Sequence, residues 1–199
     1  MIRILLILLC IPAMVFTQDS IDPEATIILD KISKKLNAND KVQLEFDLTI
    51  QFPGVEADTK AGLLMQSGSK FKVEVGPQII MSNGVDLYMI NMETKSAQLN
   101  SASSMGEDQG FMNPKEMLTL YNNGDYCYAI TGEEDYNNTR VLNIEFKPKD
   151  RYAEFSKMRM AVDKKSLDPI YLRLFNKDGS QFVLDKGISI IPTAWYSIA

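Results

Sequence analysis

The sequence contains no histidine and only two cysteines, Cys10 and Cys127. Without histidine, the chain cannot form a catalytic triad or dyad with an imidazole base, or a zinc site that needs histidine ligands. Cys10 falls in a predicted leader, so Cys127 is the only thiol expected in the mature chain. An internal disulfide is then impossible, which excludes the disulfide-rich scaffolds of secreted proteins and favours a bacterial periplasm.

Basic residues are also fewer than acidic ones. The chain has 21 Lys and Arg against 26 Asp and Glu, a net charge of −5, and loss of Arg3 with the leader makes the mature chain more negative. This balance argues against binding the phosphate backbone of nucleic acid, and against docking on an anionic membrane by charge alone. We therefore expect no nucleic-acid partner.

Long hydrophobic runs are confined to the N-terminus, where residues 4–16 follow the positive charge of Arg3. This stretch is too short to span a bilayer comfortably, as is typical of a secretory leader. The pattern predicts a cleavable signal peptide over residues 1–17 and a periplasmic mature protein. A lipidated N-terminus at Cys10 is the alternative, and the bulky leucine that precedes this cysteine disfavours it.

The feature that the sequence has in abundance is an alternation of apolar and polar residues. Over 42–51 every even-numbered residue is apolar and every odd-numbered residue is polar, which predicts a strand with one apolar face. Turn residues such as Asn83-Gly84 separate further strand-like segments at 59–66, 70–75, 78–81, 86–92, 96–99, 126–131, 140–148, 157–163, 170–175 and 180–184. We predict a mainly β protein of the α+β class, a single curved antiparallel sheet (an incomplete β-barrel) with an apolar concave face, in one domain over 18–199.

Two short amphipathic helices are predicted to accompany this sheet. Asp22-Pro23 supplies a capping residue and a proline at the first helical position, and apolar residues then recur at helical spacing. Asn113-Pro114 repeats this start, with Met117, Leu118 and Tyr121 on one side of the helix that follows. Because an apolar sheet face must be covered, we expect both helices to lie across the concavity as a lid.

The densest cluster of carboxylates, Glu133-Glu134-Asp135, is the best candidate for a cation site or an acid–base pair. Its neighbours Gly132 and Tyr136-Asn137-Asn138 are typical of a turn, so we favour a solvated hairpin loop. With no histidine and no paired acids at strand ends, a hydrolase is a minor alternative. We expect a protein that is not an enzyme and has no metal site.

Methionines are numerous, and of the eleven in the chain Met158 and Met160 share a face with Val162. Methionine is flexible and polarizable, so it suits surfaces that accept apolar partners of varied shape. For any single methionine an ordinary core position is the favoured interpretation, and periodicity does not distinguish a cavity from a packed interior. Taken together, the methionines favour an adaptable apolar surface.

Several motifs occur in a characteristic order along residues 22–184. A leader and a helix start are followed by the alternating strand, the strand–turn–strand Ile80–Tyr88, the second helix start, Asp163-Lys164-Lys165 and Phe175–Gly179. In this order the chain resembles the outer-membrane lipoprotein carrier family, LolA, and most of all its Bacteroidetes-type branch. Each motif alone is weak, and the order carries the resemblance.

The resemblance implies an incomplete β-barrel that accepts acyl chains of lipoproteins from an inner-membrane lipoprotein-releasing transporter and delivers them to an outer-membrane acceptor. Transfer would follow differences in affinity between apolar pockets, without a cofactor. Two departures stand out. The basic residue that the family carries after the strand matching 63–66 is replaced by Ser67-Gly68-Ser69, so we assign no functional arginine. The tail 187–199 lacks the usual closing segment.

A carrier of this kind, most simply a monomer, would hold acyl chains against its apolar concave face. The predicted lipid-binding residues are Leu29, Leu44, Phe46, Leu48, Leu63, Met65, Phe71, Val73, Leu87, Met89, Met117, Leu118, Ile144, Phe146, Met158, Met160, Leu172 and Leu174. The alternative function is that of a periplasmic sensor or regulatory domain of the same fold, which detects lipids or lipoproteins and signals through a partner protein.

Overall fold

The computed structural model describes residues 21–38, 41–101, 119–153 and 155–185. Each strand predicted from the sequence is present, and β7 differs most from its predicted length. The elements in chain order are α1 (Pro23–Asn37), β1 (Lys41–Gln51), β2 (Asp58–Ser67), β3 (Lys70–Val75), β4 (Gln78–Ser82), β5 (Asp86–Asn91), β6 (Ser96–Ser101), the 3-10 helix η2 (Leu120–Asn123), β7 (Tyr126–Tyr136), β8 (Thr139–Pro148), β9 (Phe155–Asp163), β10 (Pro169–Asn176) and β11 (Gln181–Asp185).

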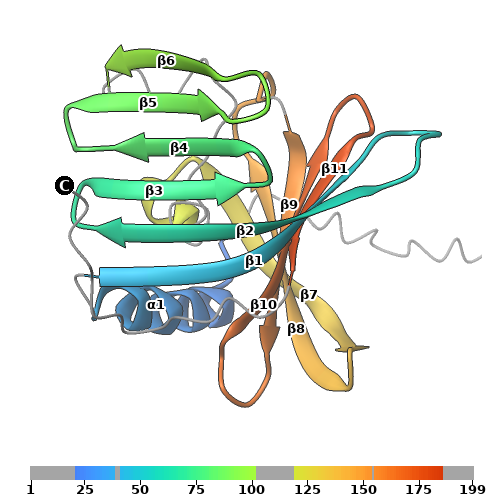
Figure 1. The fold of residues 1–199 in the computed structure, drawn as a ribbon. Coiled ribbons are helices and arrows are strands. Elements are labelled where there is room, and N and C mark those ends of the chain that lie inside the picture. Colours follow the sequence, from blue (N-terminus) through green and yellow to red (C-terminus); the bar gives the residue numbers. More distant parts are fainter. Residues whose placement is uncertain (1–20, 39–40, 102–118, 154, 186–199) are drawn as a thin grey trace, which may run out of the picture.

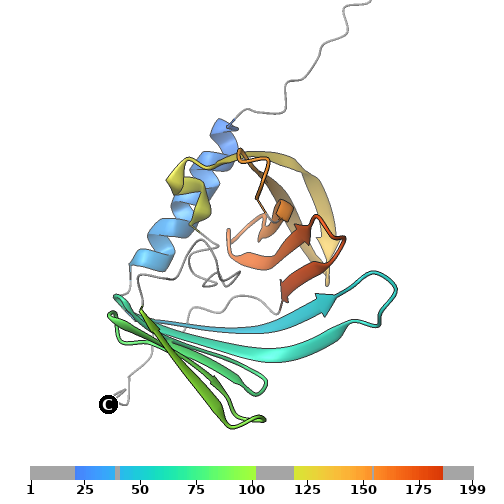
Figure 2. The same ribbon diagram turned by 90° about the horizontal axis from the view of Figure 1, so that it is seen from above.

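The eleven strands form one antiparallel sheet in the order β6-β5-β4-β3-β2-β1-β11-β10-β9-β8-β7 (Figure 1). Because β1 pairs with both β2 and β11, it joins the half formed by β1–β6 to the half formed by β7–β11. The sheet curves so that the two halves face each other without closing into a ring of described strands (Figure 2). The predicted incomplete β-barrel is thus confirmed.

The helix α1 lies along the open side of this sheet. Figure 2 shows its N-terminal end beside β7 and its C-terminal end near the start of β1. Its apolar face enters the same core as the concave face of the sheet, because its buried apolar residues belong to that core cluster: Ala25, Ile28, Leu29, Ile32 and Leu36. The helix predicted from the Asp22-Pro23 start is confirmed, and it packs on the concave side.

Asp22 fixes where this helix begins and how it meets the sheet. Its Oδ1 accepts hydrogen bonds from the backbone N–H groups of Glu24 (2.9 Å) and Ala25 (3.4 Å), which would otherwise lack partners. Its Oδ2 accepts from the N–H of Ile130 on β7 at 3.0 Å, and its own N–H donates to the carbonyl of Tyr128 at 2.9 Å. One residue therefore caps α1 and attaches it to the edge of the sheet.

The acidic cluster of residues 133–135 lies within β7, so the prediction of a loop there was wrong. The turn is shorter and falls at Asn137 and Asn138, whose φ angles of 47° and 63° suit a two-residue hairpin turn. The charges are tolerated in a strand because Arg140 pairs with Glu133 and Asp135, at 3.1 Å each. The sequence indicated the turn residues Asn137 and Asn138 correctly. However, β7 extends to Tyr136, so the polar residues 133–135 belong to the strand.

Three predictions concern residues outside the described ranges. These are the signal peptide over 1–17, most of the second helix with Met117 and Leu118, and the tail 187–199. Of the second helix, Tyr121 is described, in η2, where its hydroxyl donates to Asp30 Oδ1 of α1 at 3.0 Å. Among the described residues, no helix has the length and apolar character needed to cross a membrane.

Candidate functional site

The concave face of the sheet carries continuous apolar rows across paired strands. From β1 through β11, β10, β9 and β8, the register aligns one row of Leu48, Leu184, Leu172, Met160 and Ile144, and a second row of Ile50, Phe182, Leu174, Met158 and Phe146. Directly opposed residues on antiparallel strands point to the same face. The concave face of this half is therefore apolar from strand to strand.

A third apolar row crosses the half of the sheet formed by β1–β6. It shows that the face of β2 predicted to point into the concavity was the wrong one. Leu64 pairs with Leu44 of β1 and Val73 of β3, and it is fully buried. Leu63 and Met65 were predicted to face the concavity, but this register turns them to the opposite, convex face. The reason is that residues 61–65 are apolar without a break, so pairing with β1 decides which face is inside.

The other predicted residues divide by exposure. Those fully or nearly fully buried in the core cluster are Leu29, Leu44, Phe46, Phe71, Val73, Leu87, Ile144, Phe146, Met158, Met160 and Leu172. Those that are partly buried and packed against it are Leu48, Met89 and Leu174. Met117 and Leu118 lie outside the described residues. The buried group and the half-buried group thus belong to one apolar interior, to which α1 contributes Leu29.

An apolar cavity of about 270 Å³ lies on the concave side, where β1–β4 meet β11. Its described lining is Leu48, Ile50, Lys60, Val73, Val75, Pro77, Gln78, Ile80 and Phe182. Of this lining, only Leu48 and Val73 were among the predicted lipid-binding residues, and the other seven, Ile50 and Phe182 among them, were not predicted. Ile50 continues the alternation of 42–51, and Phe182 alternates with Leu184, so the signal was present for both.

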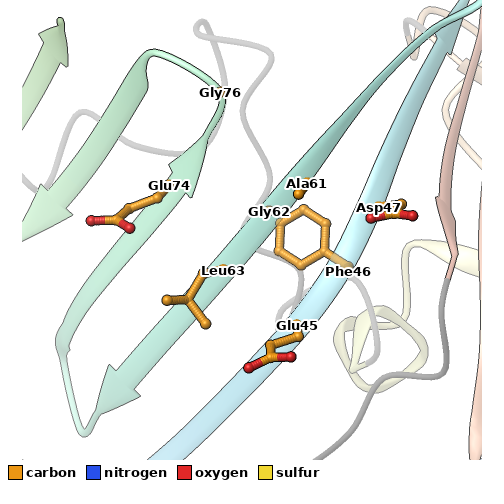
Figure 3. Close-up of a pocket in the computed structure, with 8 residues that line it drawn as sticks. All are labelled: Glu45, Phe46, Asp47, Ala61, Gly62, Leu63, Glu74 and Gly76. Carbon is orange, nitrogen blue, oxygen red and sulfur yellow. The ribbon is translucent and has the colours of Figure 1, made fainter.

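A second hollow, of about 530 Å³, has a different character. Figure 3 shows three carboxylates around it, from Glu45, Asp47 and Glu74, together with the ring of Phe46 beside Gly62. The carboxylates come from the face that alternates with the apolar rows. Although this hollow is larger, its charges make it a poor place for an acyl chain.

The convex face of the half formed by β7–β11 carries ion pairs beside a small buried cluster of Val141, Ala161 and Tyr171. Glu145 accepts from Lys157 Nζ at 2.9 Å and from Arg159 Nη2 at 3.0 Å. Burial acts to raise the pKa of Glu145, but these two hydrogen bonds outweigh it and hold the pKa below its ordinary value. Burial and a 2.8 Å hydrogen bond to Glu134 raise the pKa of Tyr171 to about 12. These polar groups thus lie away from the apolar cavity.

No protein-family model and no curated protein matches this chain. The fold, in contrast, is shared with solved structures. An uncharacterized conserved protein from Thermus thermophilus matches with a TM-score of 0.53 and 10% identity, over 86% of this chain and 90% of that one. LprF from Mycobacterium bovis matches with a TM-score of 0.49 and 11% identity, over 90% and 99%.

A LolA superfamily protein from Nitrosomonas europaea is also among the matches, with a TM-score of 0.39 and 16% identity, over 81% of this chain and 90% of that one. At such identities the likeness concerns the fold alone.

Proposed function

We propose that this protein binds acyl chains of lipids or lipoproteins in the apolar concave cavity. We propose further that it carries them through the periplasm, from an inner-membrane transporter to an outer-membrane acceptor. The observation that supports this most is the cavity itself. It is lined from both halves of the sheet by aliphatic and aromatic side chains that remain partly exposed, Ile50 and Phe182 among them.

The binding energy in this proposal comes from removing apolar surface from water. Each methylene that an acyl chain buries contributes about 0.8 kcal/mol, so about ten buried methylenes correspond to reversible binding in the micromolar range. Reversibility is what a carrier needs, because it must release its load to an acceptor with higher affinity. No covalent step is required.

The cavity must widen to take a whole chain. Its volume of about 270 Å³ lies below the range of about 300–1,000 Å³ typical of ligand sites. The core cluster of the concave face contains Met158 and Met160, whose unbranched side chains change shape readily. In this proposal the cluster rearranges as the chain enters, while the bonds from Asp22 keep α1 attached to β7.

Replacing Ile50 with Asp tests the proposal. Ile50 is half-buried at the cavity wall, so a carboxylate there should leave the fold intact and weaken binding of a fluorescent acyl-chain probe at least about tenfold, because the charge would lose its water when the chain enters. Leu99→Asp is the matched control, since Leu99 is 64% exposed on the edge strand β6. Probe titration of the mature protein measures both.

Equal binding by the Ile50→Asp variant and the wild-type protein would contradict the proposal. Transfer of a labelled lipid between donor and acceptor vesicles then separates a carrier from a sensor, because only a carrier accelerates transfer.

A further inference from the structure

Lys60 is the one charged residue in the described lining of the apolar cavity. It lies on β2 directly opposite Leu48 of β1, so the two side chains share the concave face. The row that Lys60 joins is otherwise apolar from Leu48 to Ile144, and the neighbouring row ends in Asp58 opposite Ile50. Charged side chains are costly next to apolar cavities unless the charge reaches water or a partner, so the placement of this ammonium group calls for an explanation.

The stem of Lys60 is positioned by the turn between β3 and β4. Gly76 adopts a φ of +55°, and a Cβ added there would lie 3.1 Å from Lys60 Cδ. The turn therefore leaves room for the methylenes of Lys60 to lie against it. The stem adds to the apolar wall of the cavity, and the side chain is 43% exposed, which is consistent with an ammonium group at the rim of the cavity.

The charge of Lys60 is held weakly. Its Nζ lies 3.0 Å from Asp58 Oδ2, and the two side chains are 43% and 62% exposed. Exposed pairs of this kind contribute only about 0–1 kcal/mol. A ligand anion at the rim can therefore replace Asp58 at little cost.

We propose that Lys60 binds the anionic headgroup of a lipid whose acyl chain lies in the cavity. This inference rests on the proposed function and adds a ligand class to it: acyl lipids that carry a phosphate or carboxylate close to the chain. The apolar lining binds the chain, and the ammonium group selects for the charge at its end. Asp58 opposes an anion and competes for the same lysine.

The test compares lipids that share one acyl chain and differ in headgroup charge. Palmitoyl lysophosphatidylglycerol and palmitate carry a negative charge, and monopalmitoylglycerol carries none. Displacement of a fluorescent probe should show that Lys60→Gln weakens binding of both anionic lipids about three- to tenfold and changes binding of the neutral lipid less than about twofold. Inorganic phosphate alone should not displace the probe, because it has no chain to bury.

Two further variants sharpen this test. Asp58→Asn should strengthen binding of the anionic lipids, because it frees Lys60 and removes a like charge. Lys70→Gln is the matched control, since Lys70 is an exposed lysine at the far end of β3, and it should leave binding of every lipid unchanged. Thermal unfolding of each variant monitors the fold.

The outcomes separate this inference from the proposed function. If the wild-type protein binds no lipid, the proposed function fails. If it binds neutral and anionic lipids alike, and both Lys60→Gln and Asp58→Asn leave that pattern unchanged, the headgroup inference is overturned and the carrier proposal stands. An equal loss for all lipids in Lys60→Gln would overturn it too, because it would assign Lys60 a packing role.

Discussion

Asp22 shows how a single side chain connects the helix to the sheet. One carboxylate oxygen caps α1, and the other accepts from the N–H of Ile130 on β7. This hydrogen bond, opposed by partial burial and supported by the two cap bonds, holds the pKa of Asp22 below its ordinary value. A group whose pKa is lowered by folding stabilises the folded state when it is ionised, and that contribution disappears as the pH falls through the folded pKa.

We therefore predict that Asp22→Ala lowers the free energy of unfolding by about 1–2 kcal/mol at pH 7. The difference from the wild-type protein should begin to shrink below about pH 4, where the carboxyl of the unfolded chain becomes protonated, and it should be lost as the pH falls through the lower folded pKa. Urea unfolding at pH 7 and pH 3 measures both values. Asp22→Asn is the control, because it retains a capping oxygen without the charge. A difference that does not change with pH would contradict this assignment.

Gly62 explains how β1 and β2 fit together. A Cβ at this position would lie 2.2 Å from the ring of Phe46, so the absence of a side chain lets the ring lie across β2 (Figure 3). Phe46 pairs directly with Gly62 in the register. The fit of a large ring over a glycine favours this register, which then sets the face of every other residue of β2.

At the scale of elements, β2 marks a limit of what the sequence predicts. The alternation in β1 defined its faces, because polar and apolar residues strictly take turns over 42–51. In β2 the run of residues 61–65 is apolar throughout, so either face was possible and the wrong one was predicted. Gly62, which lies opposite Phe46, indicates the correct face of β2. This indication can be used only when the pairing of β1 with β2 is known.

The corrected face of β2 leads to a direct prediction. Leu64 is fully buried among Leu44 and Val73, whereas Leu63 lies on the convex face opposite Glu45 and Glu74. Leu64→Ala should lower the free energy of unfolding by about 2–5 kcal/mol, because it leaves a cavity in the core. The neighbouring Leu63→Ala should cost less than about 1 kcal/mol. Chemical denaturation compares the two, and the reverse order would contradict the register.

The acidic segment of β7 shows the opposite kind of limit. Three consecutive acidic residues suggested a loop, but ion pairs across strands keep them in the sheet. Lys164 adds a contact to Glu133 at 2.6 Å, beside the contacts from Arg140. Arg140 lies only five to seven residues from these acids, across the hairpin, whereas Lys164 lies 31 residues from Glu133. These pairings become visible only when the strands are aligned, so the length of β7 could not be derived from local composition.

At the scale of the whole molecule, the sheet was predicted from the alternation of apolar and polar residues and from the turn residues, and α1 was predicted from its capping residue Asp22. The cavity was not, because its walls come from strands that are distant in sequence and its volume depends on packing. Lys60 was likewise hidden, since Asp58, Thr59 and Lys60 read as the polar start of a strand. Only the pairing with Leu48 and the turn at Gly76 place this lysine at the rim of the apolar cavity.

If the concave cavity holds acyl chains, they should remain with the purified protein. Native mass spectrometry of the mature protein purified from a diderm bacterium, followed by extraction and identification of bound lipids, would detect them. We expect a bound species that contains acyl chains and is reduced in the Ile50→Asp variant. A wild-type protein that carries no lipid and does not bind an apolar fluorescent probe would contradict this expectation, because the concave face would then be an ordinary packed core.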